Sequence, residues 1–199
     1  MRPMSFGQWF VVVLLIILLA FGVFVLLTRV AKAATTDQVL YDILSERDSP
    51  LADEAYTVVA FRRAQGPEFD MLAFYSVAWA ETNLARDGFY AQTYNPTCIR
   101  GGSVGTLWRD LRTGTWGSGF NTYATPRDGQ RAALRLIWER GYAPLLKAHD
   151  WRGFTKKYWG SDYYSNPEHR EEYIKDLTEA HRYLVDDGRE HGLAEVHLQ

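Results

Sequence analysis

The chain has 199 residues, of which 47% are hydrophobic, and it contains one cysteine, 22 basic and 24 acidic side chains. All the acidic residues follow Ala34, whereas three basic residues precede it, so the part from Ala34 onward has a net charge of −5. This charge argues against nucleic acid as a partner, because phosphate binding requires a basic surface. The single cysteine excludes an internal disulfide framework, and the hydrophobic content argues against a largely disordered chain.

The first feature in chain order is an apolar run from Trp9 to Leu27, interrupted only by Gly22. As a helix it is about 28 Å long, which matches the hydrocarbon thickness of a bilayer. We therefore expect one N-terminal transmembrane helix that serves as an uncleaved anchor. A cleaved signal peptide is the alternative, because Ala31-Lys32-Ala33 resembles a signal-peptidase site. The expected organisation is an N-terminal flank (1–8), a transmembrane helix or signal anchor (9–28), a linker (29–36), one domain (37–188) and a C-terminal tail (189–199).

Apolar residues at helical spacing predict that this domain is mostly α-helical. The predicted helices cover residues 37–48, 51–64, 68–85, 125–140, 142–149, 151–158 and 166–188. The helix at 68–85 has few polar residues, so we expect it to be buried on most of its circumference. The helix at 125–140 begins with Thr125-Pro126-Arg127-Asp128, which is typical of a capping box with proline at the first helical position. Gly188 is expected to stop the last helix.

Residues 87–125 differ in composition from the helical segments, because glycine, threonine, tyrosine, tryptophan and asparagine dominate them. This composition predicts loops and a small, irregular β-hairpin. The expected fold class is therefore α+β, mostly α, with a small loop and β-hairpin lobe. Helices beside such a lobe, with an acidic residue at a helix end, suit the cleavage of a polymer in a cleft.

Glu81 is that acidic residue, and it lies near the end of the predicted helix at 68–85 among mostly apolar neighbours. We expect partial burial to raise the pKa of its carboxyl group, so that it stays protonated near neutral pH. Glycoside cleavage requires such a proton donor, because a glycosidic oxygen is a poor leaving group. The alternative is an ordinary helix residue that is solvated or ion-paired.

Four short motifs occur in a characteristic order along the chain. They are Ala80-Glu81-Thr82-Asn83, Tyr94-Asn95-Pro96-Thr97-Cys98-Ile99-Arg100-Gly101, Phe120-Asn121-Thr122-Tyr123, and Tyr163-Tyr164-Ser165-Asn166-Pro167 before a helix with Tyr173. This order resembles the N-acetylglucosaminidase family of peptidoglycan hydrolases, and two of the stretches are similar to lysozyme-like domains of phage virion proteins. The resemblance implies a lysozyme-like domain that cuts the β-1,4 glycan strand of peptidoglycan, with Glu81 as general acid and base.

The resemblance also implies substrate contacts for several residues. Tyr123 matches the family's cleft tyrosine, which would bind the sugar's N-acetyl group or the attacking water, although packing beside Phe120 is an equal alternative. Asn95, preceded by Tyr94, matches the turn asparagine, and a simple Asn-Pro turn is the alternative.

Two aromatic residues complete the candidate substrate-binding set. Tyr163 offers a ring that can stack on a sugar face or pack the final helix. Trp116 falls within the loop and hairpin lobe, where a glycan groove would place it.

The turn after Asn95 departs from the family motif at two positions. The family has an aromatic residue where this chain has Thr97 and a glycine where it has Cys98. If the turn requires a positive φ at that glycine, Cys98 is strained there or the turn has a different shape.

A second catalytic carboxylate is not evident from the motifs. Asp87, Asp110 and Asp128 lie in or beside the lobe, but Asp128 already belongs to the capping box. The expected mechanism therefore uses the substrate's own 2-acetamido group, or a water placed by Tyr123, with Glu81 as acid and then base. The histidines lack a metal-ligand spacing such as H-E-x-x-H, so we expect no metal and no cofactor.

Three hypotheses for the function remain at this point. The first is a membrane-anchored hydrolase that binds peptidoglycan glycan strands outside the cytoplasm and is held to the lipid bilayer by residues 9–27. The second is a lytic transglycosylase or muramidase that acts on the same polymer. The third is an inactive glycan-binding module, or a virion or assembly module, with the same fold. A virion membrane is an alternative setting for the anchored chain.

Overall fold

The computed structural model describes residues 35–98, 106–109 and 116–193. The predicted flank, transmembrane helix and most of the linker lie outside these residues, as do Asp110 and the end of the predicted C-terminal tail. The predicted domain at 37–188 falls within one compact unit, Thr36–Gln199. Within the described ranges, none of the helices is long and apolar enough to cross a membrane.

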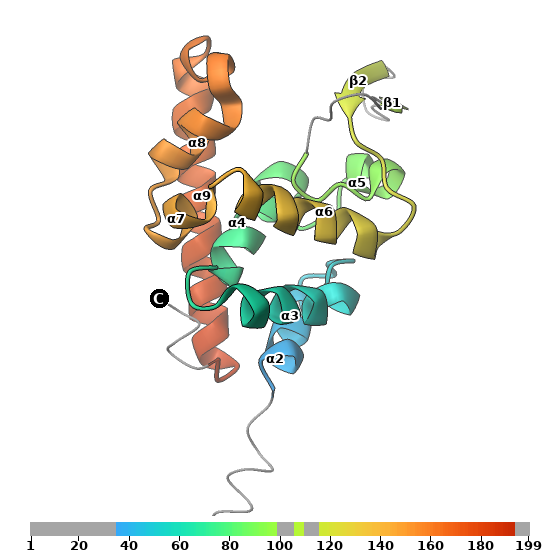
Figure 1. Ribbon diagram of the computed structural model, residues 1–199, viewed down its shortest axis with the longest axis vertical. Coiled ribbons are helices and arrows are strands. Elements are labelled where there is room, and N and C mark those ends of the chain that lie inside the picture. Colours follow the sequence, from blue (N-terminus) through green and yellow to red (C-terminus); the bar gives the residue numbers. More distant parts are fainter. Residues whose placement is uncertain (1–34, 99–105, 110–115, 194–199) are drawn as a thin grey trace, which may run out of the picture. The chain divides into compact units, whose positions relative to one another are not determined.

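This unit is mostly helical, as its apolar spacing predicts. Its α-helices are α2 (Thr36–Ser45), α3 (Ala55–Gln65), α4 (Met71–Thr82), α5 (Gly88–Thr93), α6 (Pro126–Glu139), α7 (Ala143–Lys147), α8 (Trp151–Trp159) and α9 (Pro167–Glu190). Two short 3₁₀ helices, η1 (Ala52–Glu54) and η2 (Gly160–Tyr164), and two strands, β1 (Thr106–Arg109) and β2 (Trp116–Phe120), complete the described elements (Figure 1).

Helix α4 lies at the centre of the hydrophobic core. Every residue from Met71 to Ala78 is buried, which confirms the burial expected from its apolar sequence. The helix starts later than predicted, because the Asp70 side chain accepts a hydrogen bond from the Ala73 amide at 2.8 Å and so caps it. It packs along α9, and the last turn of α4 carries Glu81.

Helix α9 is the longest described helix, with 24 residues, and it contacts α2, α4 and α8 (Figure 1). The prediction that Gly188 stops it is wrong, since Gly188 is buried within the helix and the chain stays helical to Glu190. Gly192, with φ of 78°, follows the helix end instead, where a left-handed conformation suits glycine.

Residues 87–125 contain a helix that the composition did not predict, together with the two strands. Helix α5 begins where the Asp87 side chain accepts a hydrogen bond from the Tyr90 amide at 2.9 Å. Strands β1 and β2 pair antiparallel, and their register is irregular between Thr106 and Trp108.

Helix α6 begins with the predicted capping box. The Thr125 side chain accepts a hydrogen bond from the Asp128 amide at 3.2 Å and donates one to the Asp128 carboxylate at 2.8 Å, which confirms that prediction. One residue later, Gly129 lies so close to the preceding loop that a Cβ atom there would be 1.6 Å from the Tyr94 carbonyl oxygen. Because glycine has no Cβ atom, α6 can pack directly against the backbone of Tyr94, which precedes the turn beside Glu81.

Candidate functional site

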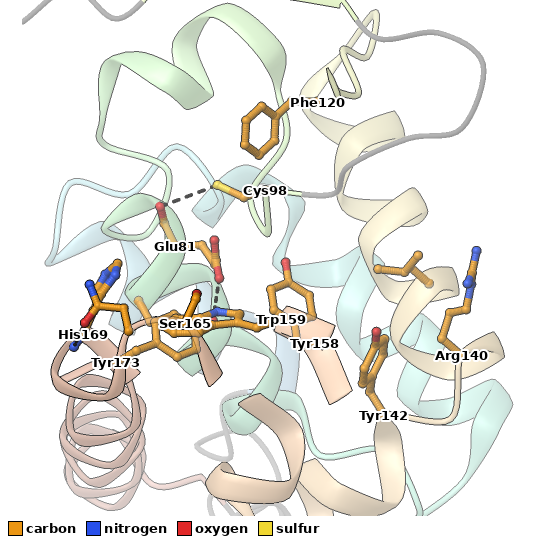
Figure 2. Close-up of a pocket in the computed structure, with 13 residues that line it drawn as sticks. Glu81, Cys98, Phe120, Arg140, Tyr142, Tyr158, Trp159, Ser165, His169 and Tyr173 are labelled. Atoms are coloured by element: carbon orange, nitrogen blue, oxygen red, sulfur yellow. Dashed lines mark hydrogen bonds between the residues drawn. The ribbon is translucent and has the colours of Figure 1, made fainter. Parts of the chain in front are cut away.

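Glu81 lines a pocket of about 640 Å³ at the C-terminal end of α4. The described lining residues come from α4, the turn before residue 99, the end of β2, α6, α8 and α9 (Figure 2). They are Ala80, Glu81, Cys98, Phe120, Leu136, Arg140, Tyr142, Tyr158, Trp159, Ser165, Asn166, His169 and Tyr173. The pocket thus gathers segments that lie far apart in the sequence around a half-buried carboxyl group.

Tyr173 on α9 holds the Glu81 side chain. Its phenol donates a hydrogen bond to Glu81 Oε1 at 2.5 Å, marked by a dashed line in Figure 2. Burial, and then the charge of Glu81, raise the pKa of Tyr173 well above its ordinary value. The phenol therefore stays protonated across the physiological range and remains a donor to Glu81.

The backbone that follows Glu81 is strained, and hydrogen bonds from buried side chains hold it in place. Asn83, Leu84 and Ala85 have φ values of 50°, 55° and 66°, each in the left-handed region that disfavours side chains. Such residues cost about 1–2 kcal/mol each and persist only where surrounding contacts enforce them. Two buried hydroxyls do so here: Ser49 Oγ donates to the Leu84 carbonyl at 2.7 Å, and Thr82 Oγ1 accepts from the Ala85 amide at 3.1 Å. This arrangement fixes the end of the helix that carries Glu81.

The turn at residues 94–98 is attached to the same helix end. Cys98 has φ of 48°, so this position adopts the left-handed conformation that favours glycine. Its Sγ donates to the Glu81 carbonyl oxygen at 3.7 Å. Thr82 Oγ1 donates to the Pro96 carbonyl at 3.0 Å, and the Tyr158 hydroxyl donates to the Thr97 carbonyl. The turn therefore forms one wall of the pocket beside Glu81.

Asn95 and Tyr94 shape this turn and are not among the described pocket-lining residues. Asn95 is fully buried, and its Nδ2 donates to the Asn121 carbonyl at 3.2 Å. Tyr94 has φ of 50° at the C-terminal end of α5, and its ring packs edge-on against Tyr90. These contacts agree with the turn-forming interpretation of Asn95.

Tyr123 is also outside the described lining of the pocket. Its amide donates to the Thr93 carbonyl at 2.9 Å, and its hydroxyl accepts a hydrogen bond from Asn121 Nδ2 at 3.3 Å. Burial raises the pKa of the Tyr123 phenol, although the Asn121 hydrogen bond acts in the opposite direction. The structure therefore places Tyr123 in the packing between this loop and α5.

The remaining two candidates lie elsewhere in the described fold. Tyr163 in η2 is buried, and the Arg170 guanidinium lies 4.9 Å from the centre of its ring. Trp116 is the first residue of β2, and its side chain is outside what the structure describes. Neither is among the described pocket-lining residues.

Several aromatic and basic residues of the pocket were missed by the sequence analysis. Trp159 lies with its ring centre 4.9 Å from that of Tyr173 and 5.3 Å from that of His169. Tyr142 and Tyr158 pack edge-on at 5.8 Å. The adjacent aromatic residues Tyr158 and Trp159, before the Asn-Pro motif, are visible in the sequence as possible sugar-binding residues. Only the packing of α8 on α9 shows that they line the pocket of Glu81.

Glu81 is the one carboxylate among the described residues that line the pocket. Asp87 caps α5, and the exposed Asp128 carboxylate accepts a hydrogen bond from Thr125, the residue that caps α6. A single carboxyl group near a phenol donor can transfer a proton to or from a bound molecule, and the surrounding rings offer apolar faces for stacking. Comparisons of the chain with protein-family models, with curated proteins and with solved structures found no match.

Proposed function

We propose that the chain is a membrane-anchored peptidoglycan hydrolase of the N-acetylglucosaminidase type, with a lysozyme-like domain. One observation carries the proposal: Glu81 lies in the last turn of a helix that is buried from Met71 to Ala78, accepts a hydrogen bond from Tyr173 and lines a pocket rich in aromatic rings. The motif order around Glu81 supports the same conclusion. The positive φ of Cys98, at the motif's glycine position, adds support.

In the proposed mechanism, Glu81 acts first as the general acid. It gives its proton to the glycosidic oxygen as the bond from that oxygen to the sugar's anomeric carbon breaks. The oxygen of the substrate's own 2-acetamido group forms a bond to the anomeric carbon. Water then attacks this carbon and displaces the acetamido oxygen, while Glu81 takes the water's proton and returns to its acid form.

The other pocket residues would bind the polymer in this scheme. Trp159, Tyr158 and Tyr142 supply rings that can stack on sugar faces. Arg140, at the C-terminal end of α6, supplies a positive charge suited to the carboxylates of peptidoglycan. Residues 9–27 would hold the domain at the membrane, next to the wall polymer and outside the cytoplasm.

Product analysis tests this function directly. The full chain, kept in a mild detergent because of its apolar N-terminal run, is incubated with purified peptidoglycan, and the released fragments are identified by mass spectrometry. We expect N-acetylglucosamine at the new reducing ends. Reducing N-acetylmuramic acid would indicate a muramidase, and exclusively 1,6-anhydro ends would show a lytic transglycosylase. Binding without any cleavage would support the inactive glycan-binding module.

A Tyr173→Phe substitution tests whether the phenol positions and tunes Glu81. We expect cleavage to slow by about 10- to 100-fold, because the carboxyl group loses the contact that orients it. A phenol that donates a hydrogen bond to a carboxylate favours the charged form of that carboxyl group. Removal of the Tyr173 phenol should therefore favour the protonated form of Glu81. The alkaline limb of the pH–rate profile should therefore move to higher pH.

The control for this experiment is Tyr183→Phe, which removes an exposed phenol from the same helix. It should leave the rate and the pH profile unchanged. A Tyr173→Phe variant with the wild-type pH profile would contradict the assigned role, even if its rate were lower. A wild-type profile that is flat from about pH 5 to about pH 8 would contradict the role of Glu81 as the acid.

A further inference from the structure

Three side chains with metal-binding atoms meet at the opposite end of α4 from Glu81. They are Asp70, which caps the N-terminus of α4, His149 in the α7–α8 turn, and His181 on α9. Asp70 Oδ2 lies 3.1 Å from His149 Nε2 and 3.9 Å from His181 Nε2. One donor atom from each residue lies within 4.8 Å of the other two.

The contacts of these residues leave donor atoms directed at a common point. Asp70 uses Oδ1 to cap α4, and its Oδ2 is hydrogen-bonded to His149 Nε2 at 3.1 Å, a contact that a bound ion would replace. His181 Nε2 is buried and has no hydrogen-bond partner within the described part of the chain. A buried polar atom in this state costs about 1–3 kcal/mol, and a bound ion would supply the missing partner. His149 has φ of 50°, a strained conformation that brings it to this cluster.

The residues around Asp70, His149 and His181 shield these side chains partly from water, which suits metal binding by uncharged imidazoles. Trp151 stacks on His149 with ring centres 5.8 Å apart and lies 5.4 Å from His181. The His181 side chain is 12% exposed, and its ring centre lies 4.1 Å from that of His149. An uncharged imidazole keeps the lone pair that a metal ion requires. The Asp70 side chain is 4% exposed and that of His149 is 35% exposed, which leaves one side accessible to water.

We propose that Asp70, His149 and His181 bind a divalent transition-metal ion, with zinc as the best match. Two imidazoles, one carboxylate and a water would complete a four-coordinate site. In a tetrahedral zinc site, donor atoms about 2.0–2.1 Å from the ion are about 3.3 Å apart, so only small side-chain shifts are needed here. The expectation of no metal came from the lack of local spacing, whereas these ligands come from three distant segments.

The position of the site indicates a structural role. Helices α4 and α9 pack antiparallel: Glu81 pairs with Tyr173 at one end, and Asp70 meets His181 at the other. A metal ion at the second end would cross-link α4 and α9 and bind the α7–α8 turn to both. It would therefore stabilise the helix pair that positions Glu81 without entering Glu81's pocket.

Metal titration of the untagged full chain in detergent tests the proposal. After removal of metals with a chelator, zinc binding is followed by calorimetry and cobalt binding by its visible absorption. We expect one equivalent of each to bind at the same site, and the cobalt spectrum to show four-coordinate geometry. At a hundredfold excess over Kd, zinc should raise Tm by about 5 °C or more. Absence of stoichiometric binding to the wild-type chain would overturn the proposal.

Three variants and one control locate the site. His149→Ala and His181→Ala should each lose the bound equivalent and the rise in Tm. Asp70→Asn keeps a helix-capping side chain but loses the charge, so it should weaken binding at least tenfold while the chain stays folded. The control is His191→Ala, because His191 lies 3.1 Å from the Glu46 carboxylate without being part of this cluster. Binding that survives both histidine substitutions, or is lost equally in the control, would overturn the assignment.

Discussion

A Glu81→Gln variant is expected to cleave peptidoglycan about 10²- to 10⁴-fold more slowly than the wild-type chain. Glutamine has nearly the same shape as glutamate, and its amide oxygen can still accept the hydrogen bond from Tyr173. It cannot donate a proton to the glycosidic oxygen or remove one from water. The variant should therefore fold normally and still bind glycan strands, while losing the chemical step.

Cleavage is measured as the release of soluble fragments from purified cell walls, and binding is measured by co-sedimentation with them. The matched control is Glu172→Gln, which makes the same change at an exposed position of α9. We expect it to retain the wild-type rate. A Glu81→Gln variant that retains more than a tenth of that rate would contradict the assignment. If wild type and variant were equally inert while both bound glycan, the enzymatic function itself would be wrong.

A Gly129→Ala substitution is expected to lower the free energy of unfolding by about 3 kcal/mol and to reduce cleavage as well. The new Cβ would lie 1.6 Å from the Tyr94 carbonyl oxygen and 2.8 Å from its carbon. Because these are backbone atoms, the first turn of α6 or the chain at Tyr94 has to move. Tyr94 leads directly into the turn in which Cys98 contacts Glu81, so the displacement should reach the pocket wall.

Urea unfolding followed by circular dichroism measures this loss of stability. Gly153→Ala in α8 is the control. Its Cβ would lie 2.2 Å from the carboxylate of Asp150, and this neighbour is an exposed side chain rather than backbone. That side chain can rotate away, but it then loses its cap on the Gly153 amide, which costs about 1 kcal/mol. Alanine is better than glycine inside a helix by about the same amount, so the net change should stay within about 1 kcal/mol. Equal effects of the two substitutions would show that the contact with the Tyr94 backbone is not the cause.

The sequence predicted elements whose signals are local. The capping box at Thr125 and the apolar composition of α4 act within one or two helical turns, and both predictions are confirmed. Helix α5 was missed because its six residues carry little apolar spacing. The prediction that Gly188 stops the last helix was wrong because tertiary packing stabilises α9, and a helix stabilised in this way tolerates an internal glycine.

Part of the candidate site could also be predicted from sequence. Glu81 was identified from its apolar neighbours and its motif. For Cys98 the sequence left two outcomes open, a strained residue with positive φ or a turn of a different shape, and its φ of 48° matches the first. Trp159 and His169 were not predicted to join it, because no local pattern marks which face of α8 or α9 meets the end of α4. Nor does a local pattern show that Tyr142, just before α7, reaches the same pocket. The substrate roles of Tyr123 and Asn95 stay predictions, and neither residue is among the described residues that line the pocket.

By itself, the sequence determined the charge balance, the apolar N-terminal run, the helical composition of the domain and the acidic residue at the end of a buried helix. Only the tertiary structure decided that Tyr173 donates a hydrogen bond to Glu81 and that donor atoms of Asp70, His149 and His181 lie within 4.8 Å of one another. The physical reason is the range of the interactions. Capping and helical spacing act over a few residues, whereas Asp70 and His149 are 79 positions apart and Glu81 and Tyr173 are 92 positions apart, and both pairs meet only through the packing of whole helices.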